Sequence, residues 1–462
     1  MRKFDWISFA IVTSLIIIGL MMIYAAGYQP DSEISFFSTQ AGRQSIFAIA
    51  TFIILISTQL IDWKFWSGVA YPFYAITILF LVLVLFIGTT VKGSTSWFQL
   101  GWFNFQPAEL AKIGTIMALA SFLSHHRTRV SDTRDLLIAS GIILLPTALI
   151  LAQGDAGSAL VFLSIFIVLF REGIAMWIPV LFLVLALLFV LALKFDIWVV
   201  LPLLLFSGSI FLLSSLKLRQ EHMIAGLSVL LISVGIAILG YLKPVIALSG
   251  LFMLYAIVES IRARQTRQVF LLSTGVIFLF GFAYLSSYLF SNVLEPHQQD
   301  RINVWLKPEE ADPRGSLYNI LQSKIAIGSG GFSGKGYLHG TMTKLNYVPE
   351  QSTDFIYSII GEEHGFIGSI AVIFLFMILM LRVVDIGERA RMPFIRHYSY
   401  GVLGVLFTHI LVNIGMTMGI MPVIGIPLPF ISSGGSSLIG FGLLIGVLLS
   451  MDSSWMRSRR AV

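Results

Sequence analysis

The chain has 462 residues, of which 57% are hydrophobic and only 12% are charged, and its formal net charge is +6 at pH 7. Because soluble proteins carry charge on about 25% of their residues, this composition excludes a soluble globular protein and indicates a surface that faces lipid. The absence of cysteine excludes disulfides, Cys-ligated zinc and thiol nucleophiles. The surplus cations fall in short loops between apolar runs, where they predict membrane orientation and not nucleic-acid binding.

Apolar runs long enough to cross a bilayer recur from one end of the chain to the other. The first begins at Ile7, after Met1-Arg2-Lys3, and has the roughly 20 residues of a spanning helix, which predicts a retained helix and not a cleaved signal peptide. Fourteen spans are predicted, near residues 7–27, 44–61, 67–88, 107–124, 136–152, 158–170, 175–193, 197–215, 223–241, 244–260, 268–289, 355–382, 398–418 and 434–451. The expected fold is therefore an all-α, polytopic transmembrane helical bundle.

Positive charge alternates between loops, which predicts the orientation of these spans. Cation-rich loops lie near 127–134, 217–219, 262–267 and 389–396, and in the tail at 457–460. The loops between them hold at most one cation each, namely Arg43, Lys92, Lys194 and Lys243. By the positive-inside rule, the cation-rich loops and both termini are expected in the cytoplasm.

Residues 290–354 interrupt the pattern with a long, polar, glycine-rich segment. On the predicted topology it forms the only large extracytoplasmic loop, and a loop of this length in a compact protein is usually functional or disordered. The helix-like stretch 317–327 favours a folded, functional loop.

A pair of opposite charges opens the span at 107–124. Glu109 and Lys112 are three residues apart, which places them on one helix face, and Pro107 suits the first turn. Charges deep in a bilayer usually pair or line a cavity. Two interpretations stay open, a structural ion pair and a pair that lines a substrate cavity.

Two aspartates begin membrane helices on the same outer side. Asp155 stands in the run 153–158 between two spans, and Asp354 stands where the large loop meets the span at 355–382. Each is a candidate helix N-cap. A half-buried carboxylate at the position of Asp354 is also a candidate general base.

The run Gly425-Ile426-Pro427-Leu428-Pro429 through Ser437 cannot form a regular helix, because it contains two prolines and, further on, Gly434 and Gly435. Irregular backbone at membrane depth is tolerated where protein or a cavity covers it. The run predicts a broken element that lines a pocket, with a plain inter-helix turn as the alternative.

Two other patterns are set aside. The run 328–336 differs from a phosphate-binding loop, because Ser329 and Gly336 stand where that pattern needs glycine and Ser or Thr. His125, His126 and His364 lack the spacing of zinc ligands. His409, inside a span, is interpreted as a hydrogen-bonded structural residue.

Together these residues resemble the SEDS family (shape, elongation, division and sporulation proteins). The run 413–437 is similar to its C-terminal signature, and the run 106–112, preceded by Trp97, is similar to its fourth-span motif. The loop run 322–351 resembles the RodA branch of the family more than the FtsW branch. The matching motifs cover roughly residues 90–160 and 300–450.

The resemblance implies a peptidoglycan glycosyltransferase of the bacterial cytoplasmic (inner) membrane. Such an enzyme polymerises lipid II on the extracytoplasmic face during cell elongation and cell-shape maintenance, with a class B penicillin-binding protein as its transpeptidase partner. By this resemblance Asp354 matches the essential loop carboxylate. The positions expected to bind substrate are Trp97, Glu109, Lys112, Asp155, Ser432 and Gly434.

The chain departs from the family pattern in several respects, two of which change the expected number of spans and the expected phosphate contacts. The family has ten spans, so about four helices are expected to be inserted, which gives an N-terminal core at 1–193, inserted helices at 194–289, the large loop at 290–354 and a C-terminal core at 355–462. The paired arginines common before Trp97 are absent, so the resemblance leaves the diphosphate to Lys112, Arg43, Lys92 or Arg301, or to a divalent cation such as Mg²⁺ or Mn²⁺.

The implied chemistry is inverting glycosyl transfer from a lipid-linked donor, with Asp354 as the candidate base. A flippase for lipid II or another polyprenyl-linked precursor is the alternative, since charges inside spans and broken helices also occur in transporters. Against it, the chain has no internal repeat, and its polar groups are expected on one side only. A scaffold that recruits cell-wall enzymes is the third hypothesis.

Overall fold

The computed structural model is mostly helical and divides into two compact units, Met1–Met176 with Asp312–Val462, and Trp177–Ala311. The structure describes residues 4–458 apart from 29–35, 92, 102, 126–127, 129, 216–227, 230–232, 234–241 and 314. The predicted inserted helices, 194–289, fall within the second unit, which also includes the helices on either side of them.

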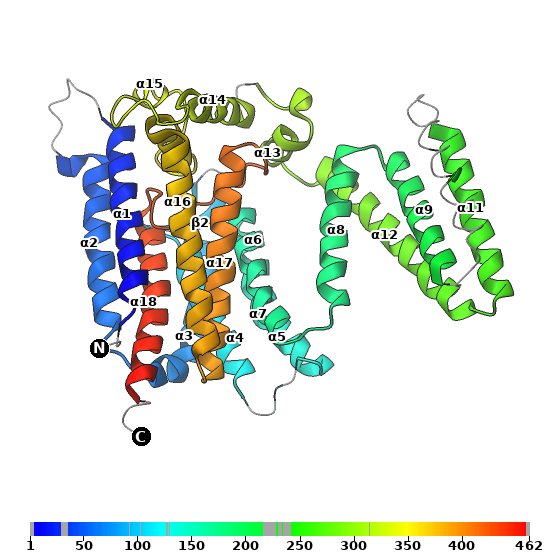
Figure 1. The fold of residues 1–462 in the computed structure, drawn as a ribbon, viewed down its shortest axis with the longest axis horizontal. Helices are drawn as coiled ribbons and strands as arrows, with labels where there is room; N and C mark the ends of the chain where they lie inside the picture. The colour runs from blue at the N-terminus through cyan, green and yellow to red at the C-terminus, as the bar shows by residue number, and fades with distance from the viewer. Residues whose placement is uncertain are drawn as a thin grey trace. The chain divides into compact units, whose positions relative to one another are not determined.

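The first unit is a bundle of membrane-length helices with short helices across one end. Its helices are α1 (Trp6–Ala26), α2 (Gln40–Thr58), α3 (Trp63–Ile87), α4 (Pro107–Leu123), α5 (Thr133–Ala152), α6 (Ala156–Leu163), α7 (Ile167–Arg171), α14 (Ser316–Ser329), α15 (Thr341–Lys344), α16 (Ile356–Arg389), α17 (Pro393–Thr417) and α18 (Gly435–Ser458). Figure 1 shows α14 and α15 lying across one end of the bundle, whereas α1 begins and α18 ends at the other. The predicted helical stretch 317–327 is confirmed by α14.

The second unit contains α8 (Trp177–Lys194), α9 (Ile197–Ser215), α11 (Leu242–Arg262), α12 (Thr266–Asn292) and α13 (Pro296–Leu306). Within it, α9 packs against α11 and α12, and α8 packs against α12. Its described helices bury small apolar clusters of their own, one of them around Phe206, Phe252 and Ala256.

Eleven helices among the described residues are long and apolar enough to cross a membrane, against fourteen predicted spans. The span predicted at 107–124 is α4, a helix of 17 residues. The span at 158–170 is divided into α6, a 3-10 turn at Ser164–Phe166 and α7, and the Ser164 hydroxyl at the break donates to the carbonyl of Val161. The span at 223–241 lies almost wholly outside the described residues.

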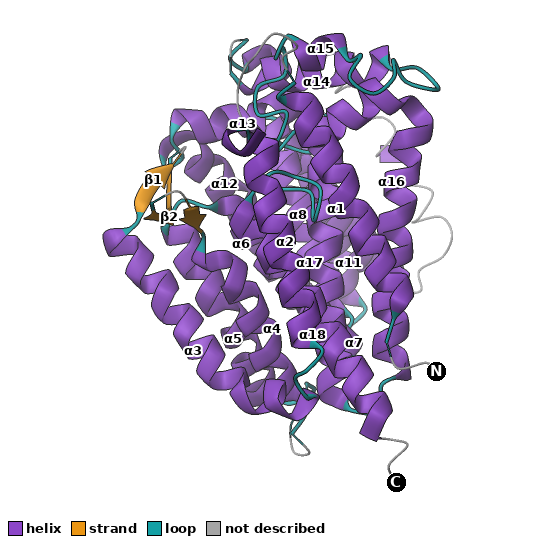
Figure 2. Cartoon of the chain, turned by 90° about the vertical axis from the view of Figure 1, so that its left-hand side faces the viewer, coloured by secondary structure: helices purple, strands orange, loops and turns teal. Residues whose placement is uncertain are grey.

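A small antiparallel sheet follows α3, which corrects the expectation of an all-α chain (Figure 2). Its strands are β1 (Thr89–Val91), β2 (Ser94–Leu100) and β3 (Phe103–Phe105), in the order β1-β2-β3. Gly93 and Gly101, which have positive φ angles of 85° and 68°, stand between the strands, where turns favour glycine. The spans on either side dominated the hydropathy pattern and obscured this short sheet.

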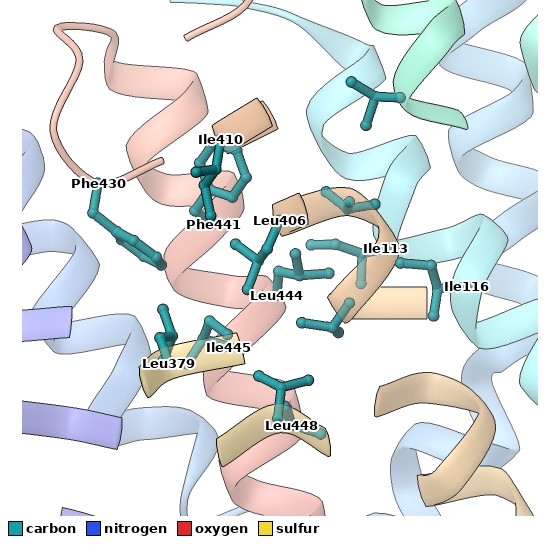
Figure 3. Close-up of a cluster of buried hydrophobic side chains, with 14 of the residues drawn as sticks. Ile113, Ile116, Leu379, Leu406, Ile410, Phe430, Phe441, Leu444, Ile445 and Leu448 are labelled. Atoms are coloured by element: carbon teal, nitrogen blue, oxygen red, sulfur yellow. The ribbon is translucent and has the colours of Figure 1, made fainter. Parts of the chain in front are cut away.

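The core of the first unit lies around α17 and α18. In their most apolar windows 67% and 78% of residues are buried, against 22% in α3, so polar side chains in α17 and α18 require partners from protein. Figure 3 shows apolar side chains of α4, α16, α17 and α18 packed together, among them Ile113, Ile116, Leu379, Leu406, Ile410, Phe441, Leu444, Ile445 and Leu448.

The glycine-rich run 328–336 supports a break in α16. This helix is interrupted at Gly365, where φ is 63° and ψ is −155°. The amide of Phe366 donates to the carbonyl of Gly331 at 2.9 Å, and the amide of Gly336 donates to the carbonyl of Glu363 at 2.9 Å. The run therefore supplies hydrogen bonds that the interrupted helix cannot make for itself.

Candidate active site

The turn that carries Asp354 is held by three hydrogen bonds to its backbone. The carbonyl of Asp354 accepts from Asn413 Nδ2 at 2.9 Å, and the carbonyl of Thr353 accepts from Ser432 Oγ at 2.6 Å. The amide of Ser433 donates to the carbonyl of Ser352 at 2.9 Å. Because α16 begins at Ile356 with Phe355 in the N-cap position, Asp354 precedes the cap, and its carboxylate lies half-buried on a fixed turn.

The segment between α17 and α18 passes directly in front of this carboxylate. Gly425 has a φ of 72°, and a Cβ added there would lie 3.3 Å from Asp354 Oδ2. On the other side of the segment, a Cβ added to Gly157 of α6 would lie 3.0 Å from the carbonyl oxygen of Ile424. Two glycines thus let the backbone of the segment lie between the start of α6 and Asp354.

Of the run 425–437 that was predicted to be irregular, 425–434 is irregular, whereas α18 already begins at Gly435. The Ser432 side chain helps to hold this segment. Ser432 Oγ accepts from the amide of Leu428 at 2.8 Å, in addition to its bond to Thr353. The amide of Gly434 donates to Gln44 Oε1 of α2 at 3.1 Å. The groups of Ser432 and Gly434 named here therefore hold this segment in place.

Glu109 and Lys112 form a buried ion pair in α4. Lys112 Nζ lies 2.9 Å from Glu109 Oε2, and each residue is only 4% exposed. The ammonium group also lies 4.8 Å from the centre of the Phe441 ring and 3.2 Å from His409 Nε2. In this structure protein encloses the pair, as expected of a structural ion pair.

His409 links this ion pair to the segment in front of Asp354. Its Nδ1 lies 3.0 Å from the carbonyl oxygen of Pro427, which accepts but cannot donate, so Nδ1 carries the proton of that bond. In the neutral ring Nε2 is then the acceptor for Lys112. The prediction of a hydrogen-bonded structural His409 is confirmed, and the bond joins α4 to the irregular segment through α17.

Asp155 is the N-cap residue of α6, as one interpretation of its sequence context predicted. Its carboxylate accepts from the amide of Ser158 at 2.9 Å and from Gln106 Nε2 at 2.9 Å. The turn before it is joined to β2, because the amide of Thr95 donates to the carbonyl of Gln153 at 2.9 Å. Trp97 lies in β2 and is partly exposed, on the strand joined to this turn.

The cations predicted to bind diphosphate differ in their exposure and in the unit that carries them. Arg43 is exposed in the first turn of α2, and Lys112 is enclosed. Arg301 belongs to α13 of the second unit, and Lys92 lies outside the described residues. Among the residues that the structure describes, no group of three or more histidine and acidic side chains is placed to hold a metal ion.

A hollow of about 370 Å³ opens beside the Asp354 turn, between the ends of α1 and α2 and the last part of the large loop. Its lining is mostly polar. The residues that line it are Ala26, Gln40, Asn346, Val348, Pro349, Glu350, Gln351, Ser352 and Thr353. Thr353, which precedes Asp354 in the chain, lines this hollow, whereas Asp354 itself is not among the lining residues.

Sequence reasoning placed Asn413 and Gly425 in motif runs without giving either a role, and it did not single out Gln44. Asn413 is fully buried within a span, and an amide in that environment requires hydrogen-bond partners. The free-energy cost of burying an amide inside a span was therefore the sequence signal that could have marked Asn413.

Comparison with known proteins relates the chain to one family along its length. The sequence model of the FtsW/RodA/SpoVE family, described as cell cycle proteins, matches residues 5–203 and 203–456. The peptidoglycan glycosyltransferase RodA of Treponema pallidum is 32% identical over 97% of this chain and 98% of its own length. The peptidoglycan glycosyltransferase MrdB of Escherichia coli K12 is 30% identical over 95% of this chain and 91% of its own length.

A solved structure shares the fold. A chain from a study of structural coordination of polymerization and crosslinking by a peptidoglycan synthase complex aligns with 99% of this chain and 99% of its own length, with a TM-score of 0.63 and 24% identity.

Proposed function

The chain belongs to the FtsW/RodA/SpoVE (SEDS) family and is a peptidoglycan glycosyltransferase, and from this premise we propose that it polymerises lipid II with Asp354 as general base. The observation that carries this assignment is the fixed turn, in which the backbone of Ser352, Thr353 and Asp354 is hydrogen-bonded and the Asp354 carboxylate faces Gly425. A base is effective when its position is fixed relative to the proton that it accepts.

In the proposed reaction the 4-hydroxyl oxygen of one lipid-linked sugar attacks the anomeric carbon of another. The new bond joins this oxygen to the anomeric carbon, and the bond from that carbon to the diphosphate oxygen breaks. The polyprenyl diphosphate leaves with the electron pair, and the hydroxyl proton passes to Asp354. The polar hollow lined by Thr353, the residue before Asp354, is proposed to receive the hydrated part of a substrate.

The leaving diphosphate requires positive charge. The enclosure of Lys112 supports a role in holding α4, α17 and α18 together, so we assign the diphosphate to more exposed cations, of which Arg43 is one. If a Mg²⁺ or Mn²⁺ ion takes part, Asp354 is the carboxylate that would hold it, and the ion would supply positive charge for the leaving diphosphate.

The reaction is assigned to the outer face of the bacterial inner membrane. The positive-inside rule assigns the 389–396 loop to the cytoplasm. Ion pairs support the helices at that end: Arg382 with Asp5 at 3.0 Å and Arg389 with Asp452 at 2.6 Å. The Asp354 turn lies at the other end of α16. A class B penicillin-binding protein is the proposed partner, and the similarity in fold to a chain of a peptidoglycan synthase complex supports it.

The test is glycan synthesis from lipid II by the purified chain, together with its penicillin-binding partner whose transpeptidase site is disabled. The assay is run in detergent, where no compartments exist, so a flippase yields no product whereas a polymerase yields glycan strands. Product from the wild type and none from folded Asp354→Ala would support the proposal. Absence of product from both, with divalent ions supplied, would favour transport or scaffolding.

A further inference from the structure

His409 and Asn413 are two buried polar side chains, four residues apart, on one face of α17. Their exposed fractions are 2% and 0%, and a spacing of four places them one above the other. His409 Nδ1 donates to the carbonyl of Pro427 at 3.0 Å. Asn413 Nδ2 donates to the carbonyl of Ile426 at 2.8 Å and to the carbonyl of Asp354 at 2.9 Å.

These three bonds are made to backbone that lacks regular helical partners. The segment that contains Ile426 and Pro427 lies between α17 and α18, and carbonyl groups at membrane depth must find donors within the protein. One amide nitrogen therefore holds the base-bearing turn and the segment opposite it in a fixed relation. Gly425, which faces the Asp354 carboxylate, is the residue directly before Ile426.

The other end of the Asn413 side chain shows that, within the described part of the chain, the residue is held by its two donated bonds alone. Asn413 Oδ1 is buried and has no hydrogen-bond partner among the described residues. A buried acceptor without a partner lowers stability, but an apolar residue would leave the carbonyls of Ile426 and Asp354 without this donor. The reversed amide orientation would point Oδ1 at two carbonyl oxygens, so the two donated bonds determine the orientation.

We propose that Asn413 and His409 are positioning residues for glycosyl transfer. They keep Asp354 and Gly425 in a fixed position relative to each other, so that the acceptor hydroxyl lies within hydrogen-bond distance of the base. The inference deepens the proposed function and rests on it. His409 adds the second support, because the ammonium group of Lys112 donates to its Nε2 and thereby keeps the proton on Nδ1, where it bonds to Pro427.

The test measures kcat and KM for lipid II in variants of the complex with the penicillin-binding partner. Asn413→Asp keeps the side-chain volume but removes the donor, and Asn413→Ala removes both. His409→Gln retains one donor and one acceptor, whereas His409→Ala retains neither. Ser399→Ala is the matched control, because Ser399 is equally buried in α17 and, among the described residues, its hydroxyl bonds to the carbonyl of Ile395 in the same helix.

Both Asn413 variants are expected to lower kcat by about 10- to 100-fold with KM changed by less than about threefold, while they elute as folded protein with retained lipid II binding. His409→Gln is expected to retain more activity than His409→Ala, and Ser399→Ala to match the wild type. Wild-type kcat in Asn413→Asp would show a packing role and overturn the inference while the proposed function stands. A wild type without glycan product would overturn both.

Discussion

Removal of one partner from the buried Glu109–Lys112 pair is expected to destabilise the protein far more than removal of both. The two side chains are each 5% exposed and 2.9 Å apart, so Glu109→Ala leaves an ammonium group enclosed by protein. Breaking such a pair costs about 3–5 kcal/mol, whereas a solvent-exposed pair contributes only about 0–1 kcal/mol. The double variant Glu109→Leu with Lys112→Met removes both charges, and its stability should return to within about 1–2 kcal/mol of the wild type.

The assay is denaturant or thermal unfolding in detergent for the wild type, both single variants and the double variant, which together form a double-mutant cycle. Glu259→Ala is the matched control, because Glu259 pairs with Arg262 over the same three-residue spacing but the arginine is 71% exposed. We expect the control to unfold almost like the wild type. If Glu109→Ala were as stable as the control, the pair would not be enclosed as the structure describes.

Three further contacts are tested by substitution. Gly334→Ala would place a Cβ 2.1 Å from a carbonyl oxygen of α16 at a φ of 82°. We expect it to lower the free energy of unfolding by more than about 2 kcal/mol. Its control is Gly328→Ala, whose added Cβ has no atom within 4 Å and which should not lower the melting temperature. Gly425→Ala would place a Cβ 3.3 Å from Asp354 Oδ2 and should slow polymerisation by about 10- to 100-fold. An unchanged rate would show that the close approach of residue 425 to the Asp354 carboxylate has no effect on catalysis. Asp155→Ala removes the N-cap bond of α6 and the partner of Gln106, so we expect a loss of about 1 kcal/mol or more in unfolding experiments, and equal stability would contradict the capping role.

Hydropathy and local sequence predicted much of the architecture, because they report on interactions between near neighbours. Apolar runs predicted most of the long helices, and proline and glycine predicted an irregular run at 425–437, of which 425–434 is irregular in the structure. The capping role of Asp155 followed from its position before a span. These features depend on a few adjacent residues and therefore appear in the sequence itself.

The contacts that build the site join distant parts of the chain, and local patterns do not report them. His409 lies 297 residues from Lys112, and Asn413 lies 59 residues from Asp354. The sequence marked Glu109 and Lys112 as costly inside a span, yet only the structure shows that protein encloses them. The sheet at 89–105 was missed because its strands are three to seven residues long.

The most direct test of the account compares lipid II binding with lipid II polymerisation in Asp354→Asn, which keeps the shape of the side chain but removes its basicity. The exposed Asp132→Asn is the control. The account predicts that Asp354→Asn binds lipid II like the wild type and polymerises it at least about 100-fold more slowly, while the control is unaffected. Polymerisation at the wild-type rate by Asp354→Asn would contradict the assignment of Asp354 as the base.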